Sequence, residues 1–281
     1  MAELRASFSG SIPEHYDRGL GPAFNEAFAA DLAQRLPVNP PGAVLEIACG
    51  TGLVTKQLRD RLDPAVRLVA TDISQAMLDY ARNKLSDREG IEWREADAVK
   101  LPFADGEFGA VVCAFGIMYV PDKRAAFREA RRVLKDGGIL IFNVWDRIEE
   151  NQHAVINAQI IEALFPGDER MRFRTPFEMH DLAILRQYLA EADFGEVHIE
   201  TKRIPFGRVS ARSVAIGFIR GTPRSLLLEE RGIPLDEVIE KVAATLAKAG
   251  GEDPYRGHAQ AIIVEARGSA KKGVSDNYFR N

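Results

Sequence analysis

The sequence has few cysteines, no excess of positive charge and no long hydrophobic run. Cys49 and Cys113 are the two cysteines in 281 residues, too few for a disulfide framework or a zinc cluster. A formal net charge of −4 provides no basic footprint for nucleic acid. No apolar run approaches membrane-spanning length, and residues 1–10 lack the apolar core of a signal peptide. These features predict a cytoplasmic protein with reduced thiols, without integral membrane association and without nucleic acid as a partner.

Residues 44–52, Val-Leu-Glu-Ile-Ala-Cys-Gly-Thr-Gly, join an apolar run with one acid to a glycine-containing turn. The pattern predicts a strand, a tight loop and a helix, with glycines that allow positive φ and close approach of a ligand. No Gly-Lys-Ser/Thr follows, so a Walker A loop is absent. The dinucleotide fingerprint also fails, because its third glycine position holds Leu53 when read from Ala48 and Thr55 when read from Gly50.

A second acid follows the next apolar run. Residues 68–73 predict a strand, and Asp72 lies 20 positions after Gly52. An acid at this strand end can accept hydrogen bonds from both ribose hydroxyls of an adenosine nucleoside. Its alternative role is to cap a helix that starts near Ser74, and the two roles are compatible.

Two further segments complete an ordered set. Asp97 and Ala98 follow a third predicted strand, and residues 108–114 form a fourth, ahead of Phe-Gly-Ile-Met at 115–118. An Asp at a strand end is commonly a turn former. In this order, however, the four segments resemble those of class I methyltransferases that use S-adenosyl-L-methionine (AdoMet). The helix predicted over residues 125–134 is expected to stop at Gly137 and Gly138.

The resemblance implies an α/β fold with a Rossmann-like, seven-stranded, mostly parallel, doubly wound sheet, in which helical insertions form a lid. It implies AdoMet as cofactor, with Glu46 holding the methionine ammonium and Asp97 the adenine amino group. Where this family usually has Gly, Ala48 narrows the approach to the cofactor. The residues expected to bind AdoMet are Tyr16, Glu46, Ala48, Gly50, Gly52, Asp72, Ile73, Met77, Asp97, Ala98, Ala114 and Phe115.

The function expected from this resemblance is methylation of a small organic acceptor at oxygen, nitrogen or carbon, with an apolar or aromatic acceptor favoured. Residues 115–118 are similar to those of ubiquinone and menaquinone C-methyltransferases, which is one alternative. The Asn/Asp-Pro-Pro-Tyr/Phe motif of enzymes that methylate nucleic-acid amino groups is missing. A non-catalytic AdoMet-binding subunit is a second alternative, and an NAD-dependent oxidoreductase a third. Both a monomer and a homodimer remain open.

Catalysis needs little from the protein if AdoMet supplies the electrophile. His180 is the best candidate for a general base, with a backbone-bonded histidine at a helix start as its alternative. Asp181 is expected to cap the next helix, and His15 and His153 to lie at the surface. Apolar residues of the second insertion, among them Val214 and Phe218, either line a pocket or pack onto the core.

The apolar patterns also divide the chain. We expect a helical lid segment at 1–42, an AdoMet-binding core at 43–146, a helical insertion at 147–180 and a core continuation at 181–206. A second helical insertion at 207–258, a final core strand at 259–267 and a mobile tail at 268–281 follow.

Overall fold

A computed structural model describes residues 8, 10–172 and 174–269. The sheet has seven strands in the order β3-β2-β1-β4-β5-β7-β6, and β7 is antiparallel to both of its neighbours, whereas β1 to β5 pair in parallel. The predicted doubly wound, mostly parallel α/β fold is confirmed. The strands are β1 Ala43–Ile47, β2 Leu68–Asp72, β3 Ile91–Glu95, β4 Phe108–Ala114, β5 Leu134–Trp145, β6 Phe194–Pro205 and β7 His258–Gly268.

Helices cover both faces of the sheet, as the burial of every residue of β2 indicates. Helices α2 and α3 pack on each other near β1, β2 and β4, and α5 and α7 pack on each other near β5 and β6. The helices of this layer arrangement are α2 Glu26–Gln34, α3 Leu53–Arg61, α4 Gln75–Lys84, α5 Lys123–Val133 and α7 Leu182–Glu191.

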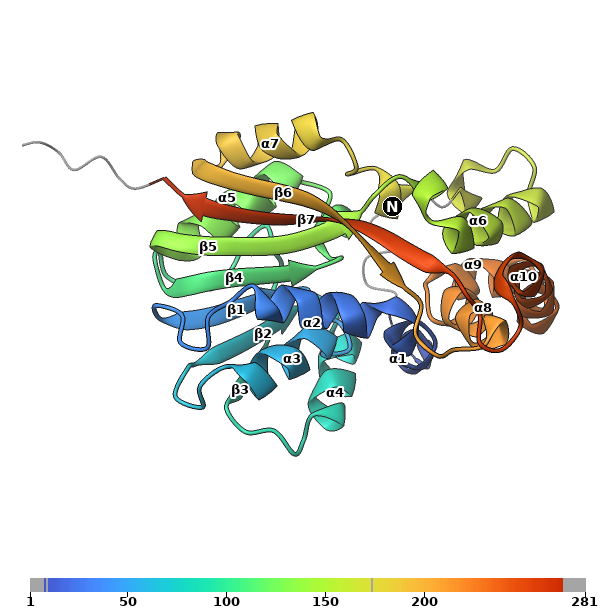
Figure 1. The fold of residues 1–281 in the computed structure, drawn as a ribbon, viewed down its shortest axis with the longest axis horizontal. Coiled ribbons are helices and arrows are strands. Elements are labelled where there is room, and N and C mark those ends of the chain that lie inside the picture. The colour runs from blue at the N-terminus through green and yellow to red at the C-terminus, as the bar shows by residue number, and fades with distance from the viewer. Residues whose placement is uncertain (1–7, 9, 173, 270–281) are drawn as a thin grey trace, which may run out of the picture.

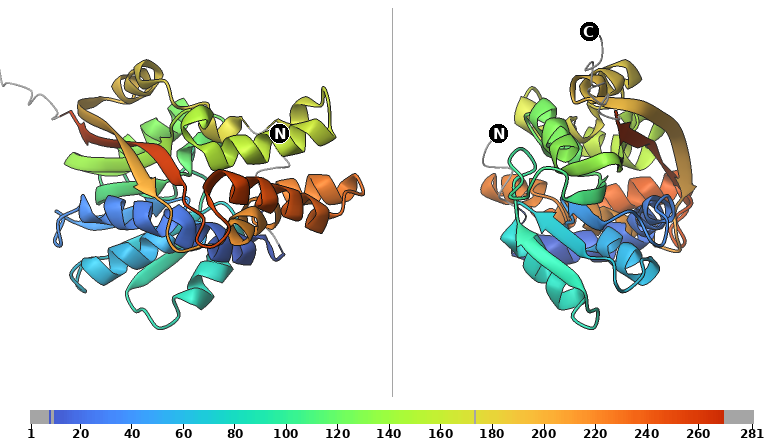
Figure 2. Two further views of the ribbon diagram at one scale, coloured as in Figure 1. Left: turned by 45° about the vertical axis from the view of Figure 1, so that its right-hand side comes forward. Right: turned by 90° about the vertical axis from the view of Figure 1, so that its left-hand side faces the viewer.

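The remaining helices gather at one end of the sheet, where the carboxyl ends of the parallel strands point (Figure 1). We call this group the cover helices. They come from the N-terminal segment and from the two insertions, so segments far apart in the chain meet over one sheet edge (Figure 2). They are α1 Ile12–Leu20, α6 Gln152–Leu164, α8 Ala211–Arg220, α9 Arg224–Glu230 and α10 Leu235–Gly250.

Helices α1 and α8 touch backbone to backbone. A Cβ atom on Gly19 would lie 2.4 Å from the Cα of Gly217, so neither position has room for a side chain. Between α1 and α2 the chain makes a π-helical turn at Gly21–Asn25. Phe24 and Phe28 are buried on this side.

Two boundaries differ from those expected. Helix α5 ends at Val133, ahead of Gly137 and Gly138, because the buried Leu134 already pairs with Phe108 of β4. The two glycines instead occupy the stretch where the register between β4 and β5 shifts. Strand β7 extends to Gly268, the first residue of the expected tail, and residues 270–281 lie outside the described part. Within the described residues, no helix is long and apolar enough to cross a membrane.

Candidate functional site

Glu46 is a buried acid near the carboxyl end of β1, 1% exposed. Its carboxylate accepts a hydrogen bond of 2.6 Å from the Thr55 hydroxyl on α3. Burial is the main cause that raises the pKa of Glu46 to about 8; the Thr55 hydroxyl acts against it, and the charge of Asp72 adds to it. An acid in this position gains from a cationic partner.

The loop after β1 bends through left-handed backbone at Ala48, Gly50 and Gly52, with φ of 55°, 53° and 78°. Its two glycines have different surroundings. A Cβ on Gly50 would meet no atom of the described residues within 4 Å, so the backbone there faces open space. A Cβ on Gly52 would lie 3.1 Å from Ala81 and from Leu85, so this glycine lets the loop pack against α4. Gly50 is therefore the position where a ligand can approach the backbone.

Asp72 ends β2 beside this loop and is 8% exposed. One carboxylate oxygen accepts the Gly50 N–H at 2.9 Å, and the other accepts the Ser74 N–H at 2.8 Å. Burial raises the pKa of Asp72 despite these donors. Ser74, not Asp72, caps α4, because the Ser74 hydroxyl accepts the N–H of Met77. The capping alternative for Asp72 is therefore wrong.

Asp97 and Ala98 follow β3, as predicted. Asp97 is exposed and its carboxylate accepts the N–H of Val99 at 3.1 Å, the bond of a turn-forming Asp. Ala98 and Met77 are buried, whereas Ile73 is 46% exposed. The turn-forming role is thus present at Asp97, and its contact with adenine stays a prediction.

Phe115 follows Ala114 at the end of β4 in a left-handed conformation, with φ of 50°. Its N–H donates to the side-chain oxygen of Asn143 at 2.8 Å, and Asn143 lies fully buried on β5. No pattern in the sequence marks this buried asparagine, which lies within an otherwise apolar part of the strand. Asn143 fixes the Phe115 backbone beside the glycine-containing loop.

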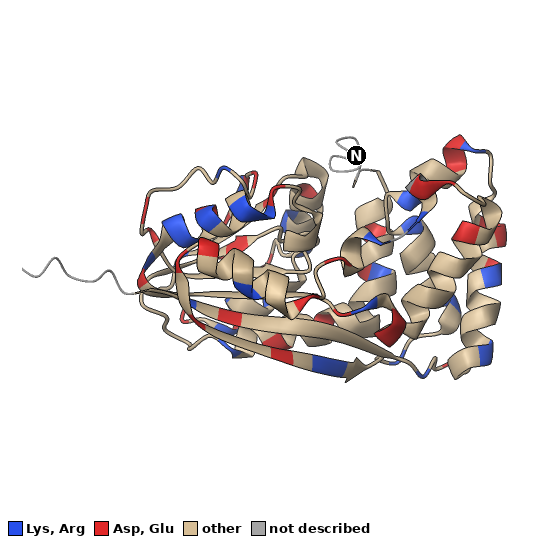
Figure 3. Ribbon diagram, turned by 90° about the horizontal axis from the view of Figure 1, so that it is seen from above, with Lys and Arg blue, Asp and Glu red and all other residues tan. Residues whose placement is uncertain are grey.

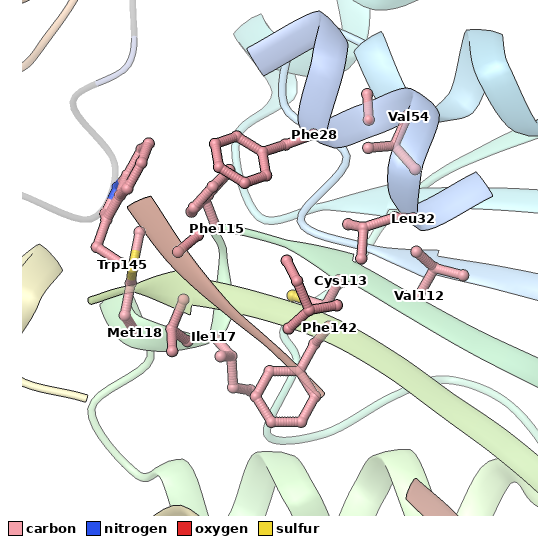
Figure 4. Close-up of a cluster of buried hydrophobic side chains, with 14 of the residues drawn as sticks. Phe28, Leu32, Val54, Val112, Cys113, Phe115, Ile117, Met118, Phe142 and Trp145 are labelled. Atoms are coloured by element: carbon pink, nitrogen blue, oxygen red, sulfur yellow. The ribbon is translucent and has the colours of Figure 1, made fainter. Parts of the chain in front are cut away.

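The ring of Phe115 stacks on Trp145, the last residue of β5, with centroids 4.0 Å apart and planes 18° from parallel. Phe28 from α2 meets both rings edge-on (Figure 4). Phe24 and Phe177 also contact the indole. The carboxyl ends of β4 and β5 therefore carry an aromatic cluster centred on Trp145, which the sequence analysis did not identify.

The N-terminal region borders the same edge. The Ser74 hydroxyl donates to the Phe8 carbonyl at 3.2 Å, so the chain before α1 passes beside the end of β2. Tyr16 on α1 is half-buried, and burial raises its pKa to about 12, so it is neutral at physiological pH. The backbone of Tyr16 packs against Gly221 after α8, where a Cβ would lie 2.6 Å away.

Two of the three histidines singled out earlier, His180 and His153, have different surroundings. Nδ1 of the half-buried His180 lies 2.7 Å from the Phe177 carbonyl oxygen, which is the backbone-bonded alternative. Asp181 caps α7, as predicted, by accepting the N–H of Ala183. The surface position predicted for His153 is wrong: the side chain is 2% exposed, because α6 turns this face toward the aromatic cluster.

Comparison with known proteins agrees with this arrangement. Residues 45–142 match the methyltransferase-domain family. The chain is 42% identical over 107 residues to a ubiquinone/menaquinone biosynthesis C-methyltransferase of Hahella chejuensis, which covers 37% of this chain and 43% of that protein. It is 36% identical over 135 residues to a demethylmenaquinone methyltransferase of Deinococcus radiodurans, which covers 47% of this chain and 56% of that protein. The chain thus spans about half, or less, of these relatives' length.

Solved structures share the fold at lower identity. Phosphoethanolamine N-methyltransferase 2 of Haemonchus contortus, in complex with S-adenosyl-L-methionine, superposes with a TM-score of 0.57 at 13% identity, covering 94% of this chain and 58% of that one. The (4+2)-cyclase SpnF superposes with a TM-score of 0.55 at 19% identity, covering 86% of this chain and 81% of that one. Residues 45–142 therefore match a methyltransferase-domain family in sequence, and the chain shares its fold with these solved structures.

Proposed function

We propose that the protein transfers a methyl group from AdoMet to a small organic acceptor with an apolar or aromatic body. The observation that carries this proposal is a pair of buried acids near the carboxyl ends of the neighbouring parallel strands β1 and β2, Glu46 and Asp72, of which Asp72 accepts the Gly50 N–H. Both have raised pKa values, so both gain from a ligand that brings positive charge or hydrogen-bond donors.

AdoMet fits this donor set. Its ammonium suits Glu46, whose carboxylate accepts a hydrogen bond from the Thr55 hydroxyl and would gain a cationic partner. Its ribose hydroxyls suit Asp72, and its body suits the open backbone face of Gly50. The Thr51 hydroxyl is buried and has no hydrogen-bond partner among the described residues, so a further polar group is accommodated here. When bound, AdoMet supplies an activated methyl group.

The role of the protein in the reaction is then to bind AdoMet and the acceptor, to orient them and to exclude water. The cover helices and the N-terminal segment would act as the lid over the carboxyl edge of the sheet, which supports an enclosed reaction. In this proposal, the aromatic cluster around Trp145 borders the acceptor. Acidic and basic residues are interspersed along the ribbon in Figure 3, and the formal net charge is −4, which favours a small molecule over nucleic acid as partner.

His180 remains the proposed general base for an acceptor that must lose a proton. If Nδ1 donates to the Phe177 carbonyl, Nε2 is left as the proton acceptor. Replacing His180 by Ala should lower turnover by roughly 10²–10⁴ with AdoMet affinity intact. An unchanged rate would exclude this role.

A quinone-type C-methyltransferase is the second candidate, favoured by the 42% identity to the Hahella chejuensis enzyme. The fold does not prove methyl transfer, since SpnF shares it and is described as a cyclase. The discriminating experiment incubates the protein with methyl-labelled AdoMet and separate sets of phenols, hydroquinones and amines. Label in a product supports the proposal and identifies the acceptor class. AdoMet binding without transfer to any set would favour the non-catalytic subunit.

A further inference from the structure

Four aromatic rings surround the buried His153 near the start of α6. The centroids of Phe206, Phe24 and Phe218 lie 5.0, 5.3 and 5.4 Å from the imidazole, and that of Trp145 lies 6.4 Å away. Trp145 ends β5, and Phe218 lies on the cover helix α8. Phe24 lies in the π-helical turn between α1 and α2, and Phe206 follows the last residue of β6. His153 therefore lies where the cover helices meet the carboxyl edge of the sheet.

The cluster is continuous with the cofactor-binding loop region. Trp145 contacts His153 on one side and stacks on Phe115 at 4.0 Å on the other. Phe115 follows β4, beside the loop that carries Gly50. On the far side, Phe206 packs edge-on against Tyr255 at 5.3 Å and lines a cavity of about 290 Å³. Phe206 therefore touches both His153 and this cavity, which His153 itself does not line.

Polar atoms on this face of α6 are buried without partners. Nδ1 of His153 has no hydrogen bond within the described part of the chain, and neither does Nδ2 or Oδ1 of Asn157. Asn157 is 1% exposed and follows His153 by four positions, so both side chains project from the same side of the helix. A buried polar group left without a hydrogen bond destabilises the fold, and a ligand that supplies the bond would remove this penalty.

The charge state of the histidine restricts the ligand. Burial lowers the pKa of His153 to about 3, although the His258 backbone acts against this shift. The imidazole is therefore neutral at physiological pH and does not neutralise an acid. A neutral imidazole and a carboxamide each offer both a donor and an acceptor, which matches a hydroxyl group.

Building on the proposed function, we propose that His153 and Asn157 hydrogen-bond a hydroxyl group of the methyl acceptor, whose flat apolar body lies among the surrounding rings. His153 is here a binding and positioning residue for the acceptor, and the proposal does not require it to remove a proton. The pair would distinguish a hydroxylated ring from the same ring without the hydroxyl.

The direct test is nitrogen NMR of protein labelled with ¹⁵N in its histidines, saturated with S-adenosylhomocysteine. The probes are 4-ethylphenol and ethylbenzene, which differ by one hydroxyl group. The His153→Gln variant assigns the His153 signals, and His198→Gln, which alters a side chain 67% exposed, is the matched control. We expect Nδ1 of His153 to shift with 4-ethylphenol and not with ethylbenzene. Equal shifts with both probes, or a shift with neither, would overturn the proposal.

A second variant tests the pair without changing the histidine. Asn157→Leu should weaken 4-ethylphenol binding by about tenfold, the loss of one hydrogen bond to a buried group, and leave ethylbenzene binding unchanged. An unchanged ratio of the two affinities would remove Asn157 from the site. Failure of S-adenosylhomocysteine to bind in calorimetry would instead count against the proposed function, whatever the histidine signals show.

Discussion

The methyl group of Ala48 occupies the space that a side chain on Gly116 would need. A Cβ atom on Gly116 would lie 2.4 Å from the Ala48 Cβ and 3.0 Å from the Cys113 sulfur. Ala48 sits in the loop after β1 and Gly116 in the turn after β4, so this contact joins the two neighbouring strand ends that border the proposed cofactor site. The Ala48 methyl is thus directed at a neighbouring turn.

Moving this methyl group from one loop to the other should be tolerated better than adding a second. Gly116 has an ordinary φ of −99°, so Gly116→Ala acts by steric overlap and should lower the free energy of unfolding by about 1–3 kcal/mol. Adding Ala48→Gly should restore most of the loss, because glycine accepts the φ of 55° at position 48. Urea unfolding of the two single variants and the double variant measures this coupling. Strictly additive effects would show that the two loops do not touch.

The two glycines of the loop should separate binding from folding. Both have positive φ, so alanine costs a similar roughly 1–2 kcal/mol of backbone strain at each. Gly50→Ala adds a methyl where the described atoms leave open space and should mainly weaken AdoMet binding. Gly52→Ala presses on Ala81 and Leu85 and should lower the melting temperature further. Calorimetry measures the AdoMet affinity of each variant, and thermal unfolding measures its melting temperature. If both variants lose affinity and melting temperature in the same proportion, the two glycines do not have separate roles.

The acidity of Glu46 should appear in the pH dependence of stability. Its pKa is raised from 4.5 to about 8 in the folded protein, so the protonated form stabilises the fold below pH 4.5. That contribution is lost as the pH rises through about 8. Without ligand, Glu46→Gln should therefore flatten the decline in unfolding free energy between pH 5 and pH 8 and should weaken AdoMet binding. A variant with the unaltered decline would show that Glu46 is not the group responsible.

The titration of His153 should change the free energy of unfolding in the opposite direction, at acidic pH. Its pKa is lowered from 6.5 to about 3, so the neutral form stabilises the fold above pH 6.5, and this contribution falls as the pH drops toward 3. Replacing His153 by Phe removes the titrating group and should reduce the acid-induced loss of stability between pH 6 and pH 4 relative to the original protein. Denaturant midpoints across this pH range measure it, with the exposed His198→Gln as control. Parallel curves for the His153 variant and the original protein would contradict the buried, neutral histidine.

Local patterns in the sequence were sufficient for much of the fold. The apolar runs predicted the strand that ends at Asp72, and the acid before the loop predicted a buried Glu46. They did not reveal that α5 would run directly into β5, because the pairing of Leu134 with Phe108 is a tertiary contact. Glycine is a strong stop signal for a helix, but here packing ends the helix earlier.

The aromatic cluster was missed for a similar reason. His153 lies on a mostly apolar helix of weak amphipathic character, and its burial depends on rings contributed by Phe24, Phe206 and Phe218, which are far apart in the sequence. Periodicity within one helix shows which face is apolar but not what covers that face. Residues whose environment is assembled from several segments therefore required the structure.

The most direct test of the account is calorimetric titration of the purified protein with AdoMet, S-adenosylhomocysteine and NAD, repeated with Asp72→Asn. We expect micromolar binding of the two adenosyl ligands and no binding of NAD. The Asp72→Asn variant should bind the two adenosyl ligands more weakly, because it loses the charged acceptor for the ribose hydroxyls. If neither adenosyl ligand binds, or if NAD binds in their place, the proposed cofactor site is wrong.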